Sequence, residues 1–175
     1  MPLSAGFLPE TFDQVTSWID EGGAVLLTGQ QTTTLDAKGR LAIPARFRSV
    51  LEESCQGQLV ITVNHDRESL LIYPRHEYEQ RAQIINKLSD FDPLERRLKL
   101  LFIGHAFDLE MDSNARVVVP SRLREIVGIH RDVVLVGQHH KLELWDEAAW
   151  SKKLDSLFTI GSEVGVSDKL KSLAL

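Results

Sequence analysis

The apolar positions of the chain fall mostly into short runs separated by polar turns, a pattern that predicts strands and short helices. Twice, an Asp-containing turn leads into an apolar triplet that is closed by a proline, at residues 36–44 and at residues 112–120. Proline lacks the amide of a strand ladder and fits the start of a helix, so each triplet is expected to be a strand followed by a short helix. Two further apolar runs follow each helix, at residues 59–63 and 70–73 and at residues 133–136 and 142–145.

These matching patterns form an internal repeat. Residues 34–48 align without a gap with residues 110–124, and the apolar positions agree in kind. The identical positions are Asp36/Asp112, Arg40/Arg116, Pro44/Pro120, Arg46/Arg122 and Arg48/Arg124. Each copy is predicted to be a ββαββ module, in which Asp caps the turn and Gly39 allows a positive φ. A module of about 45 residues buries too little apolar surface to be stable alone, so the two copies are expected to share one core.

The rest of the chain lies around and between the two modules. Two helices are predicted between them, and the second has a clear start: Asp92 as N-cap, Pro93 at the first position and Glu95 completing a capping box. The chain after Leu154 is weakly patterned and is interpreted as a partly ordered terminal helix or tail. The expected organisation is an N-terminal extension (1–24), module 1 (30–77), connecting helices (78–104), module 2 (106–149) and a C-terminal helix or tail (150–175).

The net charge of −5 over 175 residues argues mildly against a nucleic-acid partner for the chain as a whole. Residues 1–24 contain no Lys or Arg and hold much of the acidity, so the rest of the chain is nearly neutral; their acidic residues are Glu10, Asp13, Asp20 and Glu21. Two interpretations of this extension stay open. Its apolar residues have the spacing of one helical face, which would cover a partner surface or compete with a nucleic acid, or else the native chain begins near Val25.

Several function classes find no support in the sequence. No apolar run is long enough to cross a membrane and residues 1–6 lack a basic residue, so we expect a cytosolic protein with no secretory signal and no membrane partner. The lone Cys55 excludes an intrachain disulfide framework and a cysteine-based zinc cluster. No metalloprotease, phosphate-loop or serine-nucleophile motif is present, and His65, His105 and His139–His140 are interpreted as surface or core side chains. We therefore expect no enzyme activity, cofactor, metal or small-molecule substrate.

The two copies of Asp-x-x-x-Arg, apolar triplet, proline and basic helix resemble the MraZ family of double SpoVT–AbrB-type proteins. The most specific part is residues 35–48, and residues 104–106, 136–138 and 143–145 also fit. The resemblance covers residues ~26–175 and implies an α+β fold, in which the two ββαββ modules pair into a swapped-hairpin (AbrB-like) β-barrel. It also implies a homo-oligomeric ring and a DNA-binding, nucleoid-associated transcriptional regulator of the cell-division and cell-wall gene cluster.

The predicted binding site for double-stranded DNA is the first turn. Lys38, Gly39 and Arg40 place two cations and bare backbone amides where they can contact phosphates. Arg40 can also donate two hydrogen bonds to a guanine edge, which would read sequence. The alternative is that Arg40 pairs with Asp36 across the turn and only stabilises the loop.

Arg116, Arg46 and Arg48 are further candidate DNA-binding residues. The second turn has Asn114-Ala115 in place of Lys38-Gly39, so equal DNA contact by the two copies is not expected. For the helix arginines, including Arg122 and Arg124, a solvated polar face is the alternative explanation. Asp36 and Asp112 are interpreted as turn caps and salt-bridge partners.

A few cations in each module would bind DNA weakly at physiological salt. A ring that presents many copies to repeated DNA boxes would convert weak contacts into avidity, so oligomerisation is part of this hypothesis. The alternative is a non-DNA assembly or antitoxin-like protein-binding module on the same barrel, because one fold can support both roles. The exposed basic turn favours DNA, since a scaffold does not need it.

Overall fold

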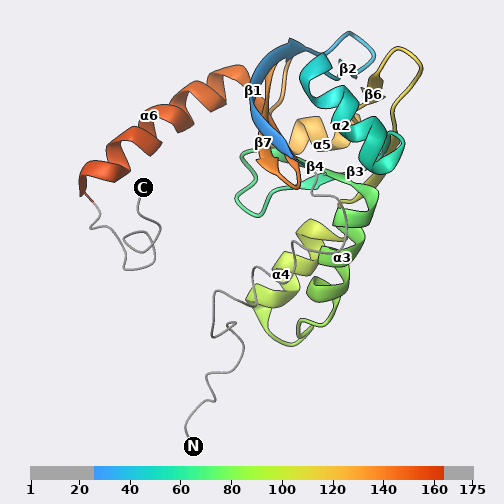
Figure 1. Cartoon of the computed structure of the whole chain (residues 1–175). Helices are drawn as coiled ribbons and strands as arrows, with labels where there is room; N and C mark the ends of the chain where they lie inside the picture. Colours follow the sequence, from blue (N-terminus) through green and yellow to red (C-terminus); the bar gives the residue numbers. More distant parts are fainter. Residues whose placement is uncertain (1–25, 164–175) are drawn as a thin grey trace, which may run out of the picture.

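The elements of the computed structural model follow the order expected from the repeat (Figure 1). The structure describes residues 26–163, with side chains up to residue 159. The first copy comprises β1 (Leu27–Thr34), β2 (Arg40–Ala42), α2 (Ala45–Cys55), β3 (Gln58–Val63) and β4 (Leu70–Pro74). The remaining elements are α3 (Arg75–Asn86), α4 (Pro93–Phe102), β5 (Phe107–Glu110), β6 (Arg116–Val118), α5 (Ser121–Val127), β7 (Asp132–His139), β8 (Leu142–Asp146) and α6 (Glu147–Glu163).

The two modules exchange their first strands. β1 pairs with β7 of the second module and β5 pairs with β3 of the first, in a six-stranded antiparallel sheet of order β1-β7-β8-β4-β3-β5. β2 and β6 pair with each other in a separate two-stranded ribbon. The α+β class and the shared sheet are as expected. No closed barrel is found among residues 26–163, so the expected barrel is not confirmed.

The main core lies between one face of the six-stranded sheet and a layer made of the ribbon, α2 and α5. Leu41 of β2 and Val117 of β6 face each other and are buried. Phe47 of α2 and Leu123 of α5 are also buried, and each such side chain stabilises the fold by about 1.5–3 kcal/mol. The two prolines that precede these helices occupy the N-cap, one position earlier than the first helical residue that the sequence predicts.

The helices α3 and α4 form a hairpin that packs on the other face of the sheet and projects away from it (Figure 1). Phe102 fixes the end of the hairpin that lies on the sheet. Its ring stacks on that of Tyr78 with 5.1 Å between ring centroids, and its carbonyl oxygen accepts a hydrogen bond from Thr62 Oγ1 at 2.8 Å. Asp92 caps α4 as predicted and accepts from the Glu95 amide at 3.0 Å. The predicted capping box is wrong in its second half, because the Glu95 carboxylate accepts from the amide of Ser89.

The C-terminal helix is longer and more regular than the weak pattern of the sequence suggests. α6 begins directly after β8 and spans 17 residues, so the described part of the stretch interpreted as a helix or tail is helical. No described helix is long and apolar enough to cross a membrane. The two interpretations of the acidic extension concern residues 1–24, which lie outside the described residues.

Candidate nucleic-acid interface

The outer face of the β2/β6 ribbon brings the two predicted turn arginines together. Side chains alternate along a strand, so the burial of Leu41 and Val117 leaves their neighbours on the outer face. The register pairs Arg40 with Val118 and Ala42 with Arg116. The two arginines therefore lie diagonally opposite each other on one face, with Val118 56% exposed between them.

The first turn, which leads from β1 to β2, is organised by Asp36. One oxygen of its carboxylate accepts from the backbone amides of Lys38 and Arg40, both at 2.9 Å, and the other accepts from Arg40 Nε at 2.5 Å. The Arg40 amide, followed by its guanidinium, holds the pKa of the Asp36 carboxyl below its usual value. The Lys38 side chain is exposed, whereas Gly39 is buried with φ +76°. The predicted role of Asp36 as a cap and ion-pair partner is present in this geometry.

The second turn, which leads from β5 to β6, has the same geometry despite its different residues. Asp112 accepts from the backbone amides of Asn114 (2.8 Å) and Arg116 (2.9 Å) and pairs with Arg116 Nε at 3.1 Å. The Arg116 amide is the largest cause of the lowered pKa of the Asp112 carboxyl. Ala115 takes the left-handed conformation of Gly39, with φ +55°, at a cost of roughly 1–2 kcal/mol. Replacing the glycine has therefore not changed the backbone of the turn, although the charge of Lys38 has no counterpart.

Backbone hydrogen bonds tie each turn to the opposite module. The Ile43 amide donates to the Ala115 carbonyl oxygen at 2.8 Å, and the Val119 amide donates to the Gly39 carbonyl oxygen at 2.9 Å. Each turn is thus hydrogen-bonded to the strand end of the other copy, and these bonds fix the two turns relative to each other.

The helix arginines Arg48 and Arg124 support the turns from inside. Arg48 Nη2 lies 3.3 Å from the Ile43 carbonyl oxygen, and Arg124 Nε donates to the Val119 carbonyl oxygen at 3.2 Å. A Cβ placed on Gly39 would lie 3.0 Å from Arg124 Nη2, so this guanidinium packs directly against the first turn. Arg48 is half-buried, and its Nε has no hydrogen-bond partner among the described residues. This placement differs from the exposed position that a DNA contact by Arg48 would need.

Arg46 and Arg122 occupy equivalent helix positions but have different surroundings. Arg46 is exposed, and its guanidinium lies against β1, where a Cβ on Gly29 would come within 2.6 Å of Arg46 Cζ. Arg122 is also exposed and lies 4.0 Å from Glu125. Of the two, Arg46 is the one held against the body of the fold.

A polar hollow of about 550 Å³ beside the first turn was not predicted from the sequence. It is lined by Asp36 and by three basic side chains from the second module, Arg124, His130 and Arg131. The amide of Leu35 donates to the Arg131 carbonyl oxygen at 2.8 Å, which fixes this residue next to the turn. In the second turn, the Met111 amide makes the corresponding bond to Gly57, which has no side chain.

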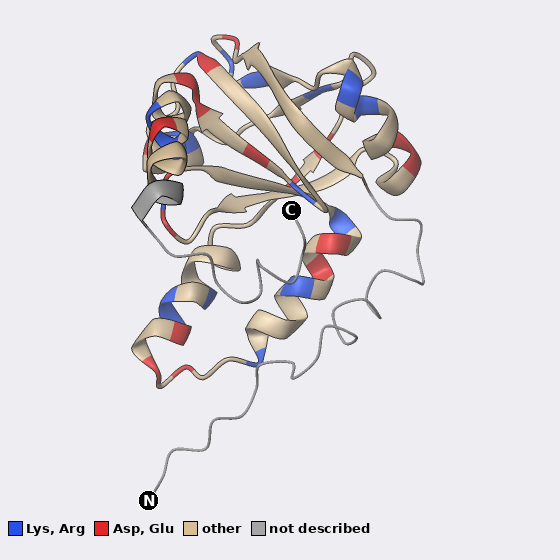
Figure 2. Ribbon diagram, turned by 60° about the vertical axis from the view of Figure 1, so that its left-hand side comes forward, with Lys and Arg blue, Asp and Glu red and all other residues tan. Residues whose placement is uncertain are grey.

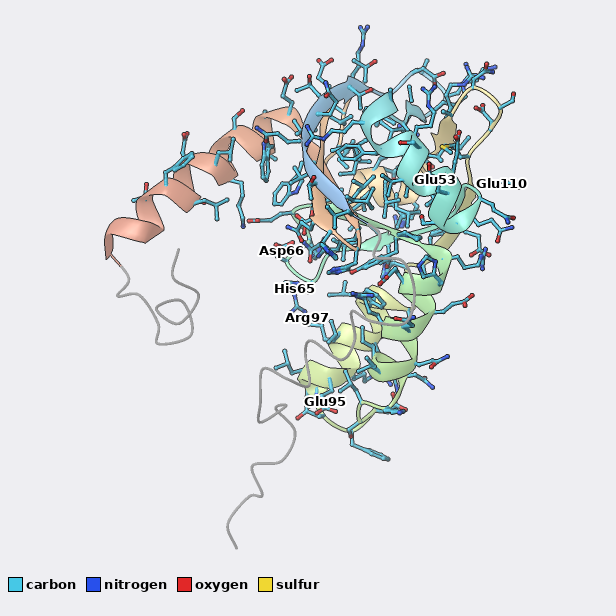
Figure 3. The ribbon with its side chains drawn as sticks, viewed as in Figure 1. Glu53, His65, Asp66, Glu95, Arg97 and Glu110 are labelled. Carbon is cyan, nitrogen blue, oxygen red and sulfur yellow. The ribbon has the colours of Figure 1, made fainter. Side chains whose placement is uncertain are left out.

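The surroundings of the second turn are acidic instead. Glu110 precedes it by two residues, and Figure 3 shows Glu110 and Glu53 on the side of the molecule where β5 leads into this turn. The two turns are alike in backbone and unlike in charge, with the cations gathered around the first.

The surroundings of His140, His105 and Cys55 are those of structural side chains. The His140 ring stacks on Tyr73 at 6.1 Å, and burial lowers the pKa of His140 to about 4. His105 Nδ1 lies 2.8 Å from the Leu100 carbonyl oxygen. Burial raises the pKa of the Cys55 thiol, which disfavours the thiolate. Within residues 26–163, no group of three or more His, Cys, Asp or Glu side chains is placed to hold a metal ion.

Comparisons with known proteins agree with the two-module organisation. The family model described as "MraZ protein, putative antitoxin-like" matches residues 26–101 and 102–169, which divides the chain between the two copies. A relative from Shewanella frigidimarina is 45% identical over 130 residues, which cover 74% of this chain and 86% of the relative. Relatives from Tolumonas auensis and Thioalkalivibrio sulfidiphilus are 40% and 42% identical over 152 and 151 residues, in each case 86% of this chain and 100% of the relative. All three bear the name "Transcriptional regulator MraZ".

Proposed function

Because the chain belongs to the MraZ family, we propose that it is a sequence-specific DNA-binding transcriptional regulator of the bacterial division and cell-wall gene cluster. The observation that carries the proposal is the outer face of the β2/β6 ribbon, where Arg40 and Arg116 lie on one exposed surface. A two-stranded ribbon has the width that the DNA major groove admits. The relatives' shared name, transcriptional regulator, supports the same role.

The first turn makes the principal DNA contact in this proposal. The ion pair with Asp36 uses Arg40 Nε, and both Nη atoms of Arg40 have no partner among the described residues. Those atoms are the ones that donate bidentately to guanine O6 and N7. Lys38 and Arg131 add cations for the flanking phosphates, which gives affinity without sequence information.

The second turn makes a weaker contact. Arg116 has the same ion pair as Arg40, but Asn114 and Gly57 stand where the first turn has Lys38 and Arg131. Neighbouring Glu110 would repel the phosphate backbone. Arg46 contributes to phosphate binding from the edge of α2, and Arg48 acts on the turn from within.

Assembly into a homo-oligomeric ring is the second part of the proposal. The exchange of β1 and β5 between the modules supports a swapped-hairpin barrel as the unit of this ring. One ribbon has few cations, and Arg40 and Arg116 are each paired with a carboxylate, so it binds weakly at physiological salt, whereas several ribbons on repeated promoter boxes gain avidity. The protein would then act in the cytoplasm, associated with the nucleoid.

Fluorescence anisotropy with duplex DNA from upstream of the protein's own gene cluster tests the proposal. The wild type, Arg40→Ala and Lys87→Ala are titrated over a salt series, because Lys87 is an exposed cation at the far end of the α3/α4 hairpin. We expect the wild type and Lys87→Ala to prefer this duplex over random DNA, and Arg40→Ala to lose the preference and to show a salt slope smaller by about one. No preference in the wild type would contradict the function, and normal binding by Arg40→Ala would contradict the site.

A further inference from the structure

A cavity of about 320 Å³ lies between the α3/α4 hairpin and the face of the sheet that the hairpin covers. Most of its wall is apolar and comes from both helices and from β4; the side chains include Leu71, Ile84, Ile85, Leu98, Leu101 and Phe102. A cavity of about 150 Å³ with aliphatic and aromatic walls holds one benzene molecule, so this one has room for a ligand of roughly a dozen non-hydrogen atoms. Its size and its apolar wall are those of a small-molecule site.

The cavity is preformed, because the hairpin is fixed to the sheet at two places. At the end of α4, Thr62 Oγ1 of β3 donates to the Phe102 carbonyl oxygen at 2.8 Å. Further out along α4, Arg97 Nη2 donates to the carbonyl oxygen of His65, in the turn between β3 and β4, at 3.2 Å (Figure 3). His65 itself lines the cavity. A ligand would therefore enter a space that the fold already holds open.

Polar side chains converge at one end of this cavity. The register of β4 and β8 pairs Leu71 with Glu143, so Tyr73 and Lys141 come next to each other on the same face of the sheet. Arg81 of α3 lies over the same place, with its Cζ 5.5 Å from the centroid of the Tyr73 ring. Arg81 is the last charged residue of α3, and Figure 2 shows the charges of this helix on the half nearer the sheet. The cavity thus has one charged end and an apolar remainder.

The carboxylates at the charged end are already occupied. Glu143 is 6% exposed; one of its oxygens accepts from Trp145 Nε1 at 3.0 Å, and the other pairs with Lys141 Nζ at 3.2 Å. The Glu77 carboxylate pairs with Arg81 Nη1 at 2.5 Å. These contacts leave no carboxylate oxygen at the charged end of the cavity ready to receive a cationic ligand.

The hydrogen-bond donors at the same end are not all used. Both hydrogen bonds of Arg81 come from Nη1, so its Nε and Nη2 have no partner among the described residues. The Tyr73 side chain is 3% exposed, and its hydroxyl also has no partner in the described part of the chain. Burial raises the pKa of Tyr73 to about 12, which keeps this hydroxyl protonated at neutral pH. The Lys141 ammonium group has further N–H donors beyond its ion pair. A donor that is withdrawn from water and left unpaired costs free energy, which an acceptor on a ligand would recover.

We propose that this cavity binds a small organic acid, whose carboxylate is held by Arg81, Lys141 and the Tyr73 hydroxyl and whose apolar body lies between the two helices and the sheet. The Nε and Nη2 atoms of a guanidinium group match the two oxygens of a carboxylate, and such charge-assisted bonds are stronger than neutral ones. A neutral ligand of the same shape would satisfy the donors less well. The site lies on the opposite face of the sheet from the β2/β6 ribbon, so it stands independently of DNA binding.

Isothermal titration calorimetry with the full chain tests the charged end. The probes are 4-phenylbutyrate and its uncharged amide, which has the same shape. We expect the wild type to bind the acid at least about tenfold more tightly than the amide. Arg81→Gln should bind the acid at least about tenfold more weakly than the wild type, whereas Arg96→Gln, an exposed arginine of α4 outside the cavity, should bind it normally.

A second pair of variants tests the location. Leu98→Trp fills the cavity and should abolish binding of both probes, whereas Leu94→Trp, one turn earlier on α4 and 71% exposed, should leave it unchanged. Thermal unfolding checks that each variant is folded. Absence of binding by the wild type at millimolar acid, or equal affinity for acid and amide, would overturn the proposal. Normal binding by folded Leu98→Trp or by Arg81→Gln would overturn the assignment of the site.

Discussion

The contrast between Gly39 and Ala115 gives a quantitative test of the turn geometry. Gly39→Ala places a methyl group 3.0 Å from the Val119 carbonyl oxygen and 3.0 Å from Arg124 Nη2, at a φ of +76°. The left-handed backbone costs an alanine roughly 1–2 kcal/mol, and the tight packing adds at least about 1 kcal/mol. The lower entropy of the unfolded alanine variant offsets about 0.4–1 kcal/mol of this, so we expect Gly39→Ala to lower the free energy of unfolding by about 1–2.5 kcal/mol.

The reciprocal change should be nearly neutral. Ala115→Gly relieves the strain of the left-handed conformation, which stabilises the fold by roughly 1–2 kcal/mol. It also removes a buried methyl group, which costs about 0.8 kcal/mol, and it raises the entropy of the unfolded chain, which costs about 0.4–1 kcal/mol more. Urea unfolding at one fixed protomer concentration measures both variants, since assembly makes stability concentration-dependent. Equal effects of the two substitutions would refute the argument that Arg124 and Val119 leave no room at the first turn.

Three further predictions concern pH and the proposed DNA surface. Asp36 and Asp112 have carboxyl pKa values that are lower in the folded than in the unfolded chain. Their stabilising contribution is therefore complete above the usual carboxyl range and is lost as pH falls through the folded pKa. Thermal unfolding should show a Tm that declines at acidic pH, and the decline should be smaller in Asp36→Asn. Val118→Glu should weaken DNA binding in anisotropy titrations with little change in Tm, because the side chain is exposed beside both ribbon arginines; a large loss of Tm would contradict its outward placement. Arg131→Ala should reduce the salt slope of DNA binding by about one, whereas an unchanged slope would exclude the hollow from the DNA surface.

The local parts of this structure could be predicted from the sequence because they depend on neighbouring residues. Asp36 is followed within four residues by the donors that its carboxylate binds, and Asp92 stands two and three residues before the amides that it caps. Such short-range geometry repeats wherever the same residues recur. The exchange of strands between modules could not be predicted from the pattern, because any of the apolar runs could pair with another, and the choice is made by packing in the shared core.

The surroundings of the proposed DNA surface were predicted less well, for identifiable reasons. Arg48 and Arg124 lie on helices whose polar face was assumed to be solvated, but both side chains bend back to carbonyl oxygens at the ends of the ribbon strands. Arg131 was missed because it comes close to the first turn only through the pairing of β1 with β7. The sequence carries no local signal for this contact, because it joins the Leu35 amide to the carbonyl oxygen of Arg131, a residue far away in the chain.

Fusion of the two modules into one chain explains how the turns could become different. In a dimer of identical modules, every substitution in one turn appears in the other, so a loss of Lys38 or Arg131 would weaken both DNA contacts. In the fused chain, the second copy keeps the hydrogen bonds that Asp112 needs to hold the ribbon, while its charges are free to change. On the proposed function, each chain then has one strong and one weak end on the DNA. A ring with heterologous contacts presents all the strong ends in the same sense, and such a ring suits promoter boxes repeated in one direction better than inverted repeats.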